Sequence, residues 1–184
     1  MGDITALIHQ ARAGDRPAFD SLFQALYPEL RRVARARLAR NVRDTLMETT
    51  VLLHECYLKF LKADRLTAED RAHFVAYAAT VMRSIVVDGV RANQSERRGG
   101  HAVHLPIDTE MEAALPAAEA EVLDVDAALR DLAALEPRLA RVVEMRYFGG
   151  MKEAEIAQVL GVTDRTVRRD WEKARLLLAH ALRG

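Results

Sequence analysis

Apolar residues recur at three- and four-residue spacing along much of the first ninety positions of this chain. The longest run covers 19–38, where arginines fill many of the intervening positions, and two further runs cover 46–61 and 74–90. This spacing places apolar side chains on one face of an α-helix, so the pattern predicts amphipathic helices. No convincing run alternates polar and apolar residues, and the hairpin-type pair Asp88-Gly89 lies inside a helical run. We therefore expect an all-α fold.

Charged residues are unevenly distributed further along the chain. No lysine or arginine occurs between positions 102 and 129, whereas seven acidic residues and two prolines do. A proline-containing stretch of one charge sign is typical of a linker. We expect two helical domains, at 1–100 and 126–184, joined by a flexible acidic linker at 101–125.

Composition limits the functional classes without choosing among them. The 184 residues include 27 Lys and Arg against 27 Asp and Glu, so nucleic-acid binding would depend on where the charges lie. The single cysteine, Cys56, falls in an apolar helical pattern and is expected to be a buried thiol in a reducing cytoplasm. No stretch approaches the ~20 apolar residues of a membrane span, and the N-terminus does not resemble a signal peptide, so we expect a soluble cytoplasmic protein.

Positions 153–178 have the pattern of a helix-turn-helix. A short helix would end at Gly161, which tolerates positive φ, and Thr163 or Asp164 would cap the next helix. The inner faces of the two helices would be formed by Ile156, Ala157, Leu160, Val167, Trp171, Ala174 and Leu178.

The outer face of the second helix is the candidate DNA-reading surface. A recognition helix in the major groove needs side chains that donate hydrogen bonds to bases and phosphates. Such residues are present here: Arg165, Thr166, Arg168, Arg169 and Lys173. The alternative is an ordinary helical hairpin with a solvated basic face, an interpretation that the acidic neighbours Asp170 and Glu172 favour.

The chain as a whole resembles the extracytoplasmic-function (ECF) sigma factors, the minimal branch of the major bacterial sigma family. The similar segments follow one another in the family's order: 15–27 resembles the opening of region two, 53–60 its polymerase-binding helix, 74–91 its promoter-melting and minus-ten helix, and 132–178 region four. The order and spacing of the segments carry the resemblance, which implies a factor that binds RNA polymerase core and directs promoter-specific initiation.

The resemblance also implies roles for individual residues. Core polymerase would be bound through its clamp helices by Glu48, Glu55, Lys59 and Lys62, and through its flap by region four. The phosphates near the minus-ten element would be contacted by Arg83, Arg91, Arg97 and Arg98. The loop at 63–73 would bind a flipped base.

Simpler structural roles are open for several of these residues. Arg83 and Asp88 would pair across helices, Arg97 and Arg98 would form a solvated helix end, and Phe74 and Tyr77 would belong to the core rather than stack on bases.

One departure from the family suggests regulation. The family carries an acidic cluster before the polymerase-binding helix, but here the corresponding run is Glu48-Thr49-Thr50-Val51, with one acid. Phosphorylation of Thr50, or less favourably Thr49, by a Ser/Thr kinase would restore negative charge and replace control by an anti-sigma partner. The alternative is that both threonines cap the helix.

Two other functions are compatible with a helical protein of this size. An enzyme is disfavoured because no phosphate-binding loop, nucleophile motif, paired carboxylates or metal-ligand spacing is visible, and no cofactor or metal is expected. A free-standing helix-turn-helix repressor would bind its operator without polymerase, whereas a sigma factor would bind DNA weakly until it joins core. A closed arrangement, in which the acidic linker masks basic surfaces, is a further hypothesis.

Overall fold

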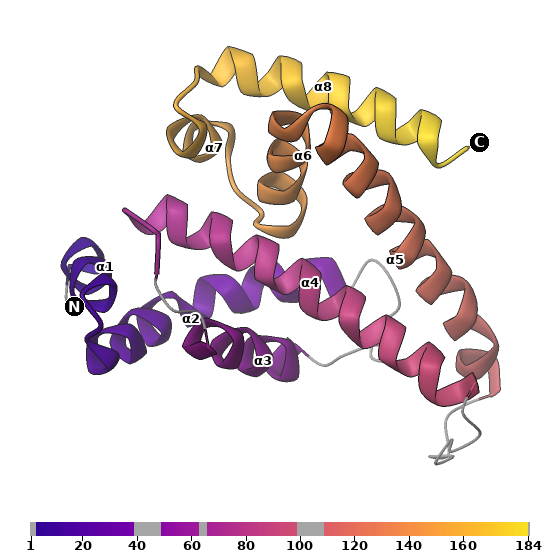
Figure 1. Cartoon of the computed structure of the whole chain (residues 1–184), viewed down its shortest axis with the longest axis horizontal. Helices are drawn as coiled ribbons and strands as arrows, with labels where there is room; N and C mark the ends of the chain where they lie inside the picture. Colours follow the sequence, from indigo (N-terminus) through magenta and orange to yellow (C-terminus); the bar gives the residue numbers. More distant parts are fainter. Residues whose placement is uncertain (1–2, 39–48, 63–65, 99–108, 184) are drawn as a thin grey trace.

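The structure, a computed structural model, describes residues 3–38, 49–62, 66–98 and 109–183. Every regular element in these ranges is helical, which confirms the all-α prediction. In chain order the elements are α1 (Ile4–Arg12), α2 (Arg16–Leu38), α3 (Thr49–Lys62), α4 (Arg71–Arg98), α5 (Thr109–Leu135), α6 (Pro137–Val143), the π-helical turn η1 (Glu144–Phe148), α7 (Glu153–Leu160) and α8 (Asp164–Ala181) (Figure 1).

The helix periodicity located α2, α3 and α4, but it did not predict α1. This helix of nine residues is capped by Asp3, whose carboxylate accepts a hydrogen bond from the Thr5 N–H at 3.0 Å. Its Ile8 is fully buried against the helices that follow. A short helix gives few turns over which a period is visible, which explains why α1 was missed.

Helices α1 to α4 enclose the larger apolar core. Phe60 of α3 stacks on Phe74 of α4 with ring centroids 5.4 Å apart, and Phe74 is fully buried. This confirms the core interpretation of Phe74, whereas Tyr77 is half-buried at the edge of the same cluster. Cys56 is also buried here, and its burial raises the pKa of the thiol to about 12.

Helices α5 to α8 form a second core. Leu129 and Leu132 of α5 contact Leu139 of α6 and Ala174 of α8. Trp171 borders this cluster and also the one that joins the C-terminal helices to α4. The C-terminal half is thus built around α6 and α8, with α5 as its first helix.

The segment expected to be a flexible linker is helical throughout its described part. Residues 101–108 lie outside the described residues, but α5 runs without interruption from Thr109 to Leu135 and crosses the boundary expected at 126. Alanine, leucine and glutamate dominate this sequence and are strong helix formers, so local propensity outweighs the like charges. Two of its acids, Glu119 and Asp126, are buried, with exposed fractions of 1% and 7%.

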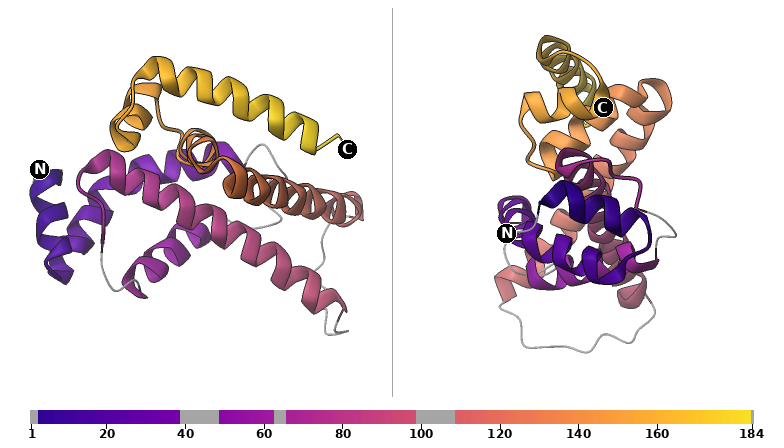
Figure 2. Two further views of the ribbon diagram at one scale, coloured as in Figure 1. Left: turned by 45° about the horizontal axis from the view of Figure 1, so that its top comes forward. Right: turned by 90° about the vertical axis from the view of Figure 1, so that its left-hand side faces the viewer.

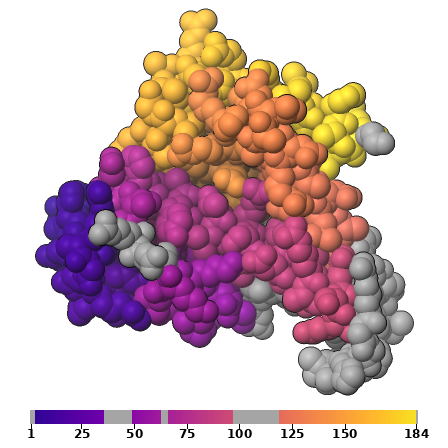
Figure 3. Space-filling model, in the orientation of Figure 1, coloured from indigo at the N-terminus to yellow at the C-terminus, as the bar shows by residue number. Residues whose placement is uncertain are grey.

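The two halves lie against each other along α4. Figures 2 and 3 show the C-terminal helices seated on the side of α4 that faces away from α3. A third apolar cluster crosses this boundary, where Ala72 and Val75 of α4 join Val142, Met145 and Ile156. At Gly149 the backbone comes so near α4 that an added Cβ would lie 3.2 Å from that of Ala79.

Neighbouring positions on α3 test this account of the N-terminal core. Leu53 has an exposed fraction of 0% and Val51 one of 46%. Leu53→Ala should lower the free energy of unfolding by about 2–5 kcal/mol, because it removes a fully buried side chain. Val51→Ala is the matched control and should change it by less than about 0.5 kcal/mol, both measured by urea denaturation. Equal effects of the two variants would contradict the packing described here.

Candidate nucleic-acid interface

The predicted helix-turn-helix is formed by α7 and α8. Gly161 follows α7 with φ +63°, in the left-handed region that favours glycine. Thr163 caps α8, and its hydroxyl accepts a hydrogen bond from the Thr166 N–H at 3.3 Å. The expected turn residue and one of the two expected cap residues are therefore confirmed.

The inner face of α8 is also as expected. Val167 and Ala174 are fully buried, and Trp171 and Leu178 are half-buried. The guanidinium of Arg146, from η1, lies 4.8 Å from the centre of the Trp171 ring and adds a cation–π contact between these elements. These contacts fix the orientation of α8 and so determine which of its residues face outward.

The expected DNA-reading residues lie on that outer face. Arg165, Arg168, Arg169 and Lys173 are exposed, and Thr166 is half-buried beside the cap. Arg168 pairs with Glu153 at 2.7 Å, and Lys173 pairs with Glu136, but such exposed pairs are weak and easily exchanged. No partner for Arg165 is found among the described residues.

Asp170 points inward rather than onto this face. It is 3% exposed, and its carboxylate accepts hydrogen bonds from Arg138 of α6 at 2.6 and 3.2 Å. This hydrogen bond, together with charge attraction, raises the pKa of the Arg138 guanidinium. One of the two acidic residues that favoured the solvated-hairpin alternative is thus part of the C-terminal core, while Glu172 stays exposed.

Two of the four cations expected at minus-ten DNA are engaged with the C-terminal half. Arg83 donates to Asp126 of α5 at 2.8 Å and also pairs with Glu144 of η1. Arg91 donates to the same Asp126 at 3.0 Å. Arg97 and Arg98 are the last residues of α4, and their side chains lie outside the described part of the chain.

The alternative in which Arg83 pairs with Asp88 is wrong. Both residues lie on α4, and residues five apart on a helix point about 140° away from each other. Asp88 instead accepts a hydrogen bond from Lys59 of α3 at 2.9 Å.

Arg71, at the first turn of α4, was missed by the sequence analysis. It pairs with Glu29 of α2 and with Glu155 of α7, the latter at 2.9 Å. Burial raises the pKa of the Glu155 carboxyl, but hydrogen bonds from the Lys152 N–H and from Arg71 lower it by more, so Glu155 is ionised at neutral pH. Since Arg71 and Glu155 are far apart in the chain, no local pattern indicates this contact.

The family model described as ECF sigma factor matches residues 1–184. The chain belongs to the ECF sigma factor family. No curated protein matches it. ECF sigma factors are transcription factors, and membership implies RNA polymerase core and promoter DNA as partners and promoter-specific initiation as the function.

The described part of the chain also bears on membrane spans and metal sites. Across the described ranges, no helix is both long and apolar enough to cross a membrane. Within the same ranges, histidine, cysteine and acidic side chains do not gather in a group of three or more that suits a metal ion.

The expected core-binding residues do not share one environment. Glu55 and Lys62 are exposed on α3, whereas the Lys59 ammonium donates to Ser84 at 3.0 Å and to Asp88 and so ties α3 to α4. Glu48 lies outside the described residues.

The two threonines lie at the start of the described part of α3. Thr49 and Thr50 are the first two residues of this helix that the structure describes. Thr50 is exposed and Thr49 is half-buried. Thr50 also borders a groove of about 460 Å³ between α2 and α3, lined by Asp20, Phe23, Gln24, Tyr27, Pro28, Thr50, Leu53, His54 and Tyr57.

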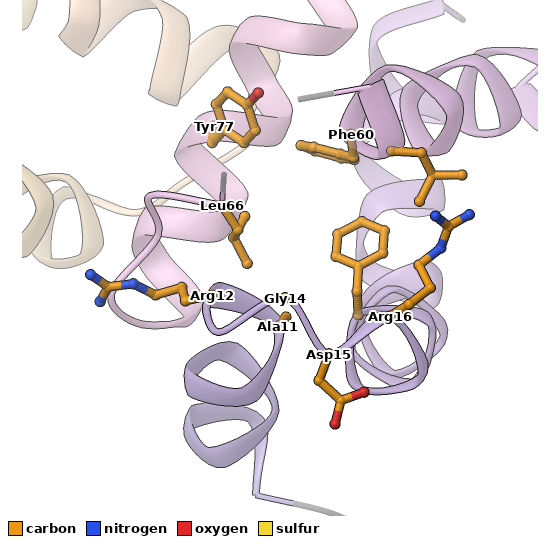
Figure 4. A pocket seen from close by; sticks show the side chains of 10 residues that line it. Ala11, Arg12, Gly14, Asp15, Arg16, Phe60, Leu66 and Tyr77 are labelled. Carbon is orange, nitrogen blue, oxygen red and sulfur yellow. The ribbon is translucent and has the colours of Figure 1, made fainter. Parts of the chain in front are cut away.

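A second cavity lies beside the loop that precedes α4. It measures about 190 Å³ and has aromatic rings on its wall and two arginines at its rim (Figure 4). Leu66 contributes from the loop itself, while residues 63–65 are outside the described part. The full lining is Ala11, Arg12, Gly14, Asp15, Arg16, Phe19, Phe60, Leu61, Leu66 and Tyr77.

The hydrogen-bonded ion pair between Asp170 and Arg138 can be tested by removing the charge of Asp170. Asp170→Asn keeps the size of the side chain but removes one hydrogen bond from Arg138 and weakens the other, so the variant should unfold more easily by about 1–3 kcal/mol. Glu172→Gln, an exposed change two residues away, should shift stability by less than about 0.5 kcal/mol. Thermal unfolding followed by circular dichroism measures both, and a neutral Asp170→Asn would refute the anchoring role.

Proposed function

We propose that this ECF sigma factor recognises its promoters with α8 at the minus-thirty-five element and with α4 and the adjacent loop at the minus-ten element. The family match over residues 1–184 carries the general function. The contact with the minus-thirty-five element is supported by the exposed basic side of α8, from which Asp170 is turned inward. Arginine there donates to guanine edges and phosphates alike.

Arg165 is assigned the leading role in the minus-thirty-five contact. It lies in the first turn of α8, which is the end of a recognition helix that approaches base edges in the major groove. Its lack of a partner among the described residues means that no ion pair must break when DNA binds. When DNA binds, phosphates replace the weak surface pairs of Arg168 and Lys173.

The cavity at the loop before α4 is assigned to a flipped base of the non-template strand. Half-buried Tyr77 offers aromatic surface, and Arg12 and Arg16 lie at its rim to neutralise the adjoining phosphates (Figure 4). Tyr77 therefore has a role beyond the core, whereas Phe74 is fully buried and does not.

The polymerase flap is assigned to exposed leucines of the C-terminal half. Leu135 and Leu176 have exposed fractions of 82% and 73%, and they belong to α5 and α8, which contact each other. Large apolar side chains exposed in this way are typical of protein-binding surfaces.

Initiation in a defined system tests the proposal. The purified protein, mixed with core RNA polymerase, should direct run-off transcription from specific genomic promoter fragments. Arg165→Ala should reduce initiation about 5- to 150-fold at limiting holoenzyme, because a good base contact contributes about 1–3 kcal/mol. Arg183→Ala, an exposed cation beyond the other end of α8, is the matched control and should initiate normally. Operator binding without any core-dependent initiation would favour the repressor instead.

Phosphorylation of Thr50 is the proposed activating event. Thr50 is exposed and lies in the first turn of α3, where there is no acidic residue and where the helix dipole favours negative charge. His54, four residues on, borders the same groove and is a hydrogen-bond donor within one turn of a phosphate. Thr49 is half-buried and is the less accessible substrate for a kinase.

Charge replacement at Thr50 tests this regulation. Thr50→Glu should tighten binding to core polymerase about two- to tenfold relative to the unmodified protein, and Thr50→Ala should not. Thr50→Gln has nearly the shape of the glutamate without its charge and is the matched control. Equal core affinities for the Glu and Gln variants, measured by fluorescence anisotropy, would show that charge at this position does not control binding.

A further inference from the structure

Asp126 is the centre of an ion-pair cluster between the two halves. Its carboxylate, 7% exposed as a residue, accepts from Arg83 at 2.8 Å and from Arg91 at 3.0 Å, both on α4. Arg130, one turn further along α5, lies 3.1 Å from it. Glu144 of η1 holds the second side of Arg83, whose side chain is only 14% exposed. Two carboxylates of the C-terminal half therefore form ion pairs with Arg83 and Arg91 of α4.

The first turn of α4 is held by the same half. Arg71 bridges Glu29 and Glu155, and the Gln158 amide of α7 donates to Asp70 at 2.7 Å. With a rise of about 1.5 Å per residue, the polar contacts span roughly 30 Å along α4, from Asp70 to Arg91. The C-terminal half is thus attached along most of one side of this helix.

The apolar part of this boundary is small by comparison. The buried α4 residues in the apolar cluster that crosses it are Ala72 and Val75, and the closest backbone approach is between Ala79 and Gly149. A boundary with small apolar residues and many ion pairs resembles a transient interface rather than a continuous core.

Building on the proposed function, we propose that Asp126 and Glu144 form an interdomain latch that holds the free sigma factor closed. In the closed form these carboxylates occupy the positions that promoter phosphates take on Arg83 and Arg91. Phosphate oxygens accept the same charge-assisted hydrogen bonds from arginine, so DNA and carboxylates compete for one surface. The latch therefore lowers the affinity of the free protein for DNA until core polymerase separates the halves.

The latch is tested in the free full-length protein. Asp126→Asn combined with Glu144→Gln keeps the side-chain shapes and removes both charges. The double variant should bind a labelled single strand of about 20 nucleotides and mixed sequence at least about fivefold more tightly, the low end of typical coupling between sites. Its radius of gyration in small-angle X-ray scattering should also rise as the halves separate.

A charge-matched control separates the latch from general repulsion. Asp20→Asn combined with Asp88→Asn also removes two negative charges, but its ion pairs, with Arg16 and Lys59, lie within the N-terminal half. This control should keep the wild-type radius and show a smaller gain in affinity. Equal gains in the two double variants, or a latch variant that stays compact, would overturn the proposal.

A steric variant opens the boundary without changing charge. Ala79→Leu adds bulk where α4 faces Gly149, so it should expand the protein and tighten DNA binding in the same direction. Ala133→Leu, an exposed change on α5, is its control. A folded Ala79→Leu protein that is expanded but binds DNA no better would also overturn the proposal, since masking by the C-terminal half would then have no effect.

Transcription distinguishes failure of the latch from failure of the proposed function. With saturating core, the Asp126 and Glu144 variant should initiate as the wild type does, because the halves are already apart in holoenzyme. A wild-type protein that never initiates would refute the proposed function, whereas the binding and scattering of the free protein would still decide the latch.

Discussion

The arginine–carboxylate pairing along α4 is the interaction on which the rest of the arrangement depends. Helix α4 supplies Phe74 to the N-terminal core on one side, and on the other it carries Arg71, Arg83 and Arg91 to acids of the C-terminal half. One helix therefore both packs in the N-terminal core and carries the expected minus-ten surface. Because an arginine cannot satisfy carboxylates and phosphates at the same time, its two roles exclude each other.

The inward orientation of some acids explains how a chain of zero net charge can present a basic face. Asp126, Glu144 and Asp170 pair with arginines inside the fold. On α8, Asp170 is turned inward to Arg138 while Arg165 faces solvent. The local field at the outer side of α8 is therefore basic even though the total charge is zero.

The proposed phosphosite and the expected core-binding residues lie close together in the chain but face different neighbours. Thr50 borders the groove against α2, whereas Lys59 is directed to α4. Residues 50 and 55 point about 140° apart on a helix, so a phosphate on Thr50 does not simply extend the face that carries Glu55. Its effect on polymerase would come through the α2–α3 groove and the helix terminus.

The sequence by itself determined the helical class, three long helices and the helix-turn-helix. These features depend on local rules: the apolar period of 19–38, the positive φ at Gly161 and the cap at Thr163 are each decided within a few residues. The buried state of Phe74 and Cys56 follows from the same period. The resemblance to the ECF sigma factors also came from sequence, because it depends on the order of segments rather than on their contacts.

Only the tertiary structure decided which charges meet. Nothing local relates Arg71 to Glu155, or Arg83 to Asp126 and Glu144, because the partners are brought together by packing of helices far apart in the chain. Composition likewise suggested a flexible linker at 101–125, where α5 is helical from Thr109 and its Asp126 is buried against α4. From sequence alone, an acidic residue is expected to be exposed to solvent. Whether it is buried beside a cationic partner depends on how the whole chain folds.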